Sequence, residues 1–165
     1  GNTDFPDSLK QKGLSGALGA GYDSCAAMQV RISIKAKETK EFVFLTPPDL
    51  YPFYILQSVN RPDCLLPVVN PFDIYKEYEL PISENDMEAL CTQNKKDLLI
   101  LNVAVIPKDI TKMTVNMAAP IVINTKELVG KQVIPDNSNY SIREPLYETY
   151  LKLKKKGGQS HACTV

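Results

Sequence analysis

The sequence contains no tryptophan and a single histidine, His161, which follows a Gly157-Gly158 pair near the C-terminal end. Most general-base, nucleophile-activating and zinc sites use at least one positioned histidine. The most conspicuous acidic pair, Glu84 and Asp86, suits the first turn of a helix rather than acid–base chemistry. We therefore expect no enzymatic activity, no metal and no cofactor.

An excess of charge of either sign is also missing, because 19 lysines and arginines balance 19 aspartates and glutamates. A neutral chain has no general attraction for a polyanion, so we expect no direct contact with nucleic acid. No apolar run approaches the roughly 20 residues that a membrane-spanning helix needs. The sequence thus predicts no membrane partner either.

Closely spaced cysteines are absent too. Cys25, Cys64, Cys91 and Cys163 lie at least 27 residues apart, so they form no C-x-x-C metal or redox motif. Four cysteines are enough for two disulfides in a secreted protein, but no signal peptide precedes them. We expect reduced thiols and a cytoplasmic location.

The 165 residues suffice for one domain with its own core. Glycines punctuate residues 1–27, but no predicted strand precedes them and no Gly-Lys-Ser/Thr follows, which disfavours a phosphate-binding loop. We expect a flexible or atypical leader at 1–27, a β domain at 28–156 and a disordered tail at 157–165.

Most of the domain shows the two-residue period of β-strands. Segment 97–106, DLLILNVAVI, is apolar on both faces, which predicts a central strand covered on both sides. Within it, we expect Asn102 to pair with a neighbouring backbone or to mark a bulge. The predicted strands are 29–35, 41–46, 53–59, 64–69, 75–80, 97–106, 113–118, 121–123 and 131–134.

Two helices are predicted, Ser83–Cys91 and Pro145–Lys156. Ser83 is a favourable N-cap, and Pro145 suits a first helical position, where its missing N–H costs nothing. The lysines of the second helix complement the negative helix end. The fold class predicted from these patterns is all-β with two short helices.

The segment 113–134 is typical of a hairpin that shapes a surface. Pro120 lies between two of its predicted strands and has no N–H for a ladder, so it marks an edge, a bulge or a break. Residues 124–130 are expected to connect to the returning strand.

Four blocks of the sequence resemble the family of the flagellar assembly factor FliW in order and spacing. They are PFYILQSV (52–59), VVNPFDIYKEYELPI (68–82), LLILNVAVIPKDITKMTVNMAAPIVIN (98–124) and GKQVIPDNSNYSIREPL (130–146). Family members usually carry a Phe-Pro-x-Gly-hydrophobic-x-Gly-Phe loop near the front. Phe5-Pro6 and the glycine-rich stretch do not reproduce its spacing.

The resemblance implies a small, mostly antiparallel, barrel-like fold in the bacterial cytoplasm, without a catalytic site. It also implies two partners: the RNA-binding regulator CsrA, whose repression of flagellin translation FliW-type proteins relieve, and flagellin itself. The family's antagonism is described as allosteric, that is, as a coupling free energy between FliW and RNA on CsrA. The alternative hypothesis is a direct RNA-binding β-barrel module, and the salt dependence of RNA binding distinguishes the two.

We expect the partner-binding surface among polar side chains on or beside the strands of these blocks. Tyr140 and Arg143 are the stronger candidates, because aromatic residues and arginine anchor protein interfaces. For Asn116 and Gln132, the alternative is that both pair with backbone around Pro120 and hold the shape of the hairpin. The candidate set is Thr114, Asn116, Asn124, Lys131, Gln132, Asn137, Tyr140 and Arg143.

Overall fold

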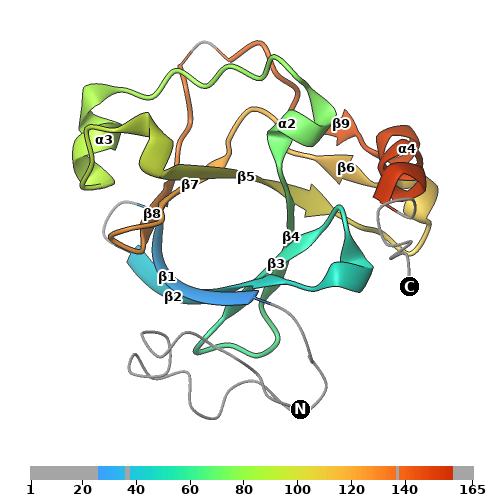
Figure 1. The fold of residues 1–165 in the computed structure, drawn as a ribbon, viewed down its shortest axis with the longest axis horizontal. Coiled ribbons are helices and arrows are strands. Elements are labelled where there is room, and N and C mark those ends of the chain that lie inside the picture. The colour runs from blue at the N-terminus through green and yellow to red at the C-terminus, as the bar shows by residue number, and fades with distance from the viewer. Residues whose placement is uncertain (1–25, 36–37, 137, 158–165) are drawn as a thin grey trace, which may run out of the picture.

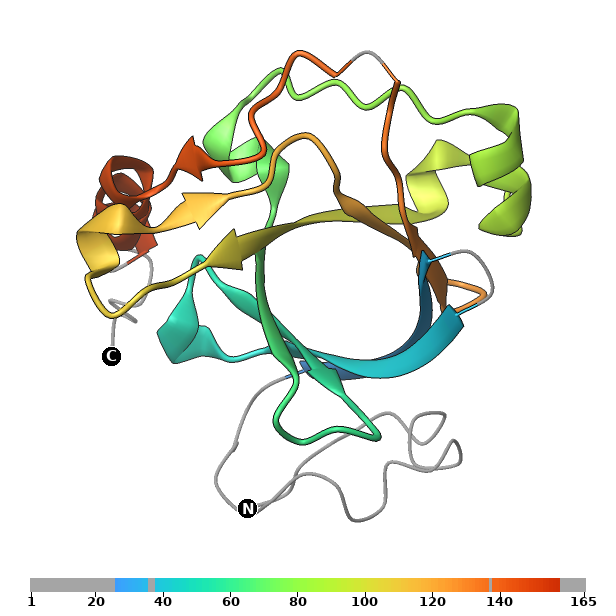
Figure 2. The same cartoon turned by 180° about the vertical axis from the view of Figure 1, so that it is seen from behind.

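The computed structural model describes residues 26–35, 38–136 and 138–157, and a closed β-barrel lies at its centre (Figures 1 and 2). Its strands pair in the order β4-β3-β2-β1-β8-β7-β5, and β4 pairs with β5 to close the ring. All these pairings are antiparallel except that of β1 with β8. The expected all-β, mostly antiparallel barrel is confirmed. The barrel strands are β1 (Ala26–Lys35), β2 (Glu38–Thr46), β3 (Tyr54–Ser58), β4 (Leu65–Val69), β5 (Leu98–Val105), β7 (Ile121–Asn124) and β8 (Val129–Gln132).

β1 begins at Ala26, two residues before the predicted start of the domain. The remainder of the predicted leader, the tail from residue 158 and the candidate residue Asn137 lie outside the described residues.

Alternation along the strands fills the barrel. Val30 and Ile32 are fully buried, whereas Arg31 between them is exposed. Burying one such apolar side chain contributes about 1.5–3 kcal/mol, so this interior is the main source of stability for the barrel. The buried cluster consists of Val30, Ile32, Phe42, Leu56, Val68, Leu101, Ile121 and Ile123.

Gly130 is required where β8 passes between β1 and β7. A Cβ atom at this position would lie 3.0 Å from the carbonyl oxygen of Val122 and 3.1 Å from Cγ1 of Ile123. It would also lie 3.3 Å from Cγ1 of Ile32 on β1. A larger residue would not fit at this position without a shift of its neighbours. β8 starts at Val129, two residues earlier than predicted, after a turn at residues 125–128.

A second, smaller sheet is formed by pairing with the C-terminal end of β5. β6 (Thr114–Val115) pairs with β5 and then with β9 (Glu144–Pro145), so the predicted strand 113–118 is shortened to two paired residues. α2 (Pro71–Ile74) and α4 (Tyr147–Gly157) lie beside this sheet (Figure 1), and their side chains pack into its core. Its core consists of Phe53, Val69, Tyr78, Ala104, Met113, Val115, Met117 and Leu146.

α3 (Glu84–Ala89) lies against the outer face of the barrel, where Leu90 packs with Val122 of β7. Ser83 caps it, in a capping box with Asp86. The helix ends two residues before the predicted Cys91 because Leu90 is its C-cap and Cys91 adopts a left-handed φ of 54°. The first predicted helix is thus confirmed with a shorter C-terminal end.

α4 begins at Tyr147 rather than Pro145, because Pro145 pairs with Thr114 in β9. The predicted role of Pro145 in the first turn is therefore wrong, while the helix itself is confirmed. Three short 3-10 helices complete the connections: η1 (Pro48–Leu50), η2 (Lys95–Asp97) and η3 (Ile110–Lys112).

The predicted strand at 75–80 is wrong. Asn70 caps a short helix by accepting the N–H of Phe72 at 3.1 Å, and Pro71 takes its first position, which produces α2. The chain then turns, and the Tyr78 hydroxyl donates to the carbonyl of Met117 at 2.8 Å. Side-chain anchoring replaces a backbone ladder in this segment.

Candidate functional site

Asn116 and Gln132 hold the backbone around Pro120. Asn116 Oδ1 accepts the N–H groups of Ala118 and Ala119, both at 3.1 Å. Gln132 Nε2 donates to the carbonyl of Ala119 at 3.2 Å. These bonds occupy both side chains where the ladder is interrupted. The alternative interpretation, in which both residues shape the hairpin, is confirmed.

Asn102 also has a structural contact. Its Nδ2 donates to the carbonyl of Asn116 at 2.6 Å, inside a fully buried position of β5. The expected pairing with a neighbouring backbone is confirmed.

Asn124 joins the end of α3 to the barrel. Its side chain is buried, and Nδ2 donates to the carbonyl of Leu90 at 2.8 Å. Oδ1 accepts the N–H of Lys126 at 2.9 Å and that of Glu127 at 3.2 Å. A helix C-terminus leaves backbone carbonyls without hydrogen-bond donors. The Asn124 amide supplies a donor to one of these carbonyls. It is therefore inaccessible to a protein partner in this structure.

Lys131 forms an ion pair with Asp86 of α3, with Nζ 2.6 Å from Oδ1. Burial alone would raise the pKa of Asp86, but hydrogen bonds from Lys131 and Ser83 together with the lysine charge lower it below its usual value. Both side chains are mostly buried, so this pair ties α3 to β8.

Thr114 is half-buried on β6, between its pairing partners Val105 and Pro145. Like the residues above, this candidate on a strand has a structural position, at an edge or an interruption of the sheet. The two remaining described candidates, Tyr140 and Arg143, lie on the segment that leads into β9.

Tyr140 belongs to a group of rings that we call the aromatic cluster: Phe72, Tyr75, Tyr78 and Tyr140. The ring centroids of Tyr78 and Tyr140 lie 4.7 Å apart, and those of Tyr75 and Tyr140 lie 5.8 Å apart. Phe72 meets Tyr78 edge-on at 6.0 Å. The Tyr140 hydroxyl accepts the N–H of Glu79 at 3.0 Å. The cluster thus links the chain after α2 to the segment before β9.

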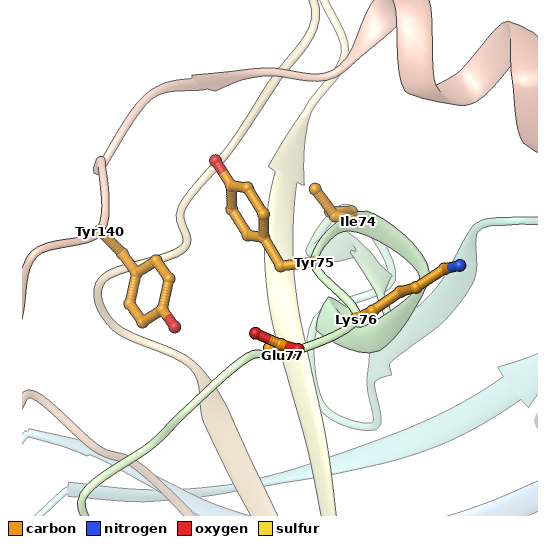
Figure 3. A pocket seen from close by; sticks show the side chains of 5 residues that line it. All are labelled: Ile74, Tyr75, Lys76, Glu77 and Tyr140. Atoms are coloured by element: carbon orange, nitrogen blue, oxygen red, sulfur yellow. The ribbon is translucent and has the colours of Figure 1, made fainter.

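An open hollow of about 320 Å³ lies beside the cluster, lined by Ile74, Tyr75, Lys76, Glu77 and Tyr140. Figure 3 shows the Tyr75 and Tyr140 rings on its two sides and the Glu77 carboxylate near the Tyr140 hydroxyl. The ammonium of Lys76 points away from the gap between the two rings.

The phenols of Tyr75 and Tyr78 stay protonated at neutral pH, because the pKa of each is raised. A hydrogen bond to the Glu144 carboxylate raises the pKa of Tyr75, and burial raises it further. Burial raises the pKa of Tyr78, which a hydrogen bond from Asn102 partly opposes. Both hydroxyls therefore remain hydrogen-bond donors.

Exposed apolar side chains accompany the cluster on the same segment. Ile134 and Ile142 are 71% and 68% exposed, and Arg143 is exposed beside Ile142. Phe72 in α2 is 46% exposed. This segment and α2 thus carry exposed aromatic, arginine and apolar side chains, and aromatic and arginine residues are enriched in protein-binding sites.

Sequence reasoning missed Phe72, Tyr75 and Tyr78 as site residues because it placed two of them in a strand. Their spacing of three residues departs from the two-residue period of a strand. With the Asn-Pro pair at 70–71 as a helix start, that spacing was the available indication of rings gathered after a turn.

Within the described ranges, no group of three or more histidine, cysteine, aspartate or glutamate residues is placed to hold a metal ion. No helix in that part of the chain is long and apolar enough to cross a membrane.

Comparison with protein families finds the model of the FliW protein family over residues 36–146. A model of the glycosyl hydrolase 94 supersandwich domain matches residues 1–52, a stretch too short to show a family and mostly outside the described residues. β1 precedes the FliW match, in keeping with the unusual front of the chain.

Similar curated proteins are named flagellar assembly factor FliW. The one from Clostridium botulinum (strain Okra / Type B1) is 38% identical over 112 residues, which cover 68% of this chain and 78% of that protein. The one from Clostridium novyi (strain NT) is 36% identical over 111 residues, covering 67% and 78%. A crystal structure of the flagellar assembly factor FliW superposes with a TM-score of 0.60 at 34% identity, covering 65% of this chain and 74% of that one. By sequence and by fold, this chain belongs to the FliW family.

Proposed function

We propose that the protein is a non-enzymatic regulator that binds a CsrA-type RNA-binding protein and relieves its repression of flagellin translation. It also binds flagellin, so that free flagellin competes for it and couples flagellin synthesis to flagellar assembly. Both partners place its action in the bacterial cytoplasm. Membership of the FliW family over residues 36–146 is the observation that carries this proposal.

The aromatic cluster and Arg143 are the surface we propose for partner binding. This surface joins rings from two segments with exposed apolar side chains at positions 134 and 142. The other described candidates bond to backbone or to α3, or lie between paired strands, and offer little to a partner.

The direct test is calorimetric titration of the protein with purified CsrA and, separately, with flagellin. We expect both to bind. In a translation assay with a flagellin leader, we expect the protein to relieve repression by CsrA and added flagellin to restore that repression. Failure of CsrA and flagellin to bind under any salt condition would refute the proposal.

Arg143→Ala tests the surface itself. Arg143 is exposed, and its bond to the Ser141 hydroxyl is made by the backbone N–H, which the substitution keeps. We expect CsrA binding to weaken by about 1–2 kcal/mol with an unchanged melting temperature. The matched control is Arg61→Ala, on the turn between β3 and β4, across the barrel from α2 and β9 (Figures 1 and 2).

Tyr140 needs a milder substitution than the sequence suggests. Replacement by alanine would remove two ring contacts and leave the N–H of Glu79 without its acceptor, so stability would fall together with binding. Tyr140→Phe keeps the rings and removes only the hydroxyl. We therefore expect a small loss of stability from Tyr140→Phe and a larger one from Tyr140→Ala.

The alternative, direct RNA binding by the barrel, predicts an RNA affinity that falls steeply with salt. The balanced charge of the chain counts against it. Measuring RNA binding by the isolated protein between low and physiological salt distinguishes the two functions, and we expect no binding.

A further inference from the structure

The hollow beside the aromatic cluster has the chemistry of a receptor for a cationic side chain. Two aromatic rings, those of Tyr75 and Tyr140, line it, with centroids 5.8 Å apart and ring planes tilted by 36°. A carboxylate, that of Glu77, lies at its edge. Ring faces attract cations through their quadrupole, and a carboxylate adds a charged acceptor.

The hollow is lined by one carboxylate, that of Glu77, and one ammonium, that of Lys76. The ammonium of Lys76 points away from the rings (Figure 3). The described lining therefore places no ammonium between the two rings and the Glu77 carboxylate.

We propose that this hollow receives an arginine side chain from the protein partner. The planar guanidinium stacks on a ring while its N–H groups reach a carboxylate in the same plane, which a compact ammonium does less well. Ile74 supplies an apolar wall for the arginine stem. This inference rests on the proposed function in one respect: it takes the aromatic cluster as the surface that contacts the protein partner.

The two rings are held before any partner arrives. Tyr140 is fixed by the N–H of Glu79 and by the ring of Tyr78, which itself donates to the carbonyl of Met117. The Tyr75 ring packs against that of Tyr140, with 5.8 Å between centroids. Side chains that are already ordered lose little conformational entropy on binding, so the site is preorganised.

The test uses the full chain, labelled with ¹⁵N, and a probe rather than a partner. Nα-acetyl-arginine amide is titrated against its neutral isostere, Nα-acetyl-citrulline amide, while backbone amide shifts are followed. We expect saturable shifts at residues 75–79 and 139–144 with the arginine probe, and at least roughly threefold weaker binding of citrulline. Equal shifts with both probes would overturn the inference, and so would equal affinity for the corresponding lysine amide.

Glu77→Gln removes the charge at the edge of the hollow and keeps an exposed side chain of the same size. We expect this variant to bind the arginine probe at least about threefold more weakly than the unmodified protein. Glu88→Gln on α3 should leave the affinity for the probe unchanged. An unchanged probe affinity in Glu77→Gln would overturn the assignment of the carboxylate.

Titration of CsrA into the same two variants separates this inference from the proposed function. Weaker CsrA binding by Glu77→Gln supports both. Unchanged CsrA binding, with the arginine probe still lost, supports the arginine site and moves the CsrA interface elsewhere. Unchanged probe binding with no CsrA complex at all overturns both.

Discussion

Replacing Asn124 with alanine removes the side chain that closes the C-terminal end of α3. The amide lies in a position that is 2% exposed and bonds to the carbonyl of Leu90 at 2.8 Å. Leaving a buried carbonyl without a donor costs about 1–3 kcal/mol. The two bonds from Lys126 and Glu127 lie at an exposed turn, where water replaces them, and add about 0.5 kcal/mol each. We expect Asn124→Ala to lower the free energy of unfolding by about 2–4 kcal/mol.

For a domain of this size, that loss lowers the melting temperature by roughly 6–12 °C. Far-UV circular dichroism follows both unfolding experiments, since the chain has no tryptophan for fluorescence. Urea denaturation measures the free energy of unfolding, and a thermal melt measures the melting temperature. Asn124→Asp distinguishes the two halves of the amide. It keeps an acceptor for the turn but puts a carboxylate oxygen against the Leu90 carbonyl, so it should be at least as destabilising as alanine. The control, Asn139→Ala at an exposed position, should change stability by no more than about 0.5 kcal/mol. A stability of Asn124→Ala within that same margin would refute the assignment of Asn124 to the helix end.

Three further substitutions test the packing of β8 and the attachment of α3 to the barrel. Gly130→Ala places a methyl group 3.0 Å from a carbonyl oxygen in β7 and should destabilise by about 1–3 kcal/mol in urea denaturation. Lys131→Met removes the partner of Asp86. Because the pKa of Asp86 is lowered in the folded state, the stability from this pair is present above the unfolded value of about 3.9 and is lost as pH falls through the folded value. The variant should therefore lose about 1 kcal/mol at pH 7 and show a flatter acid limb between about pH 5 and pH 2; an unchanged acid limb would contradict this. Cys91→Gly relieves the left-handed φ of 54° at the end of α3 and should raise the free energy of unfolding by about 0.5–1 kcal/mol, whereas a lower melting temperature would show that the thiol packs favourably.

The barrel strands were predictable because their signal is local. Alternation in β1 and a run that is apolar on both faces in β5 each follow from burial on one or two sides. Helix starts were predictable for the same reason at Ser83, where the cap and its acidic partner are three residues apart. Pro145 was placed in the wrong element because the same φ suits a first helical position and an edge strand.

The site was less predictable because it depends on contacts between distant segments. Tyr78 and Tyr140 are 62 positions apart, yet their rings lie 4.7 Å from each other. Nothing local to either residue indicates the other. Tyr140 was nevertheless a candidate in the sequence, since aromatic residues anchor protein interfaces, but its ring partners were not predicted.

Polar side chains beside a break in a ladder are poor candidates for partner binding in a small barrel. A break leaves backbone N–H and carbonyl groups without partners, and these cost free energy unless a nearby side chain satisfies them. Asn116 and Gln132 do so at Pro120, and Asn124 does so where α3 ends. Each of these side chains therefore already has at least one backbone partner before a protein partner arrives. Rings beside a turn differ, as Tyr140 shows: its hydroxyl bonds to backbone, and the residue still lines an open hollow. A surface that binds proteins is thus better sought among anchored aromatic rings than among the amides of interrupted strands.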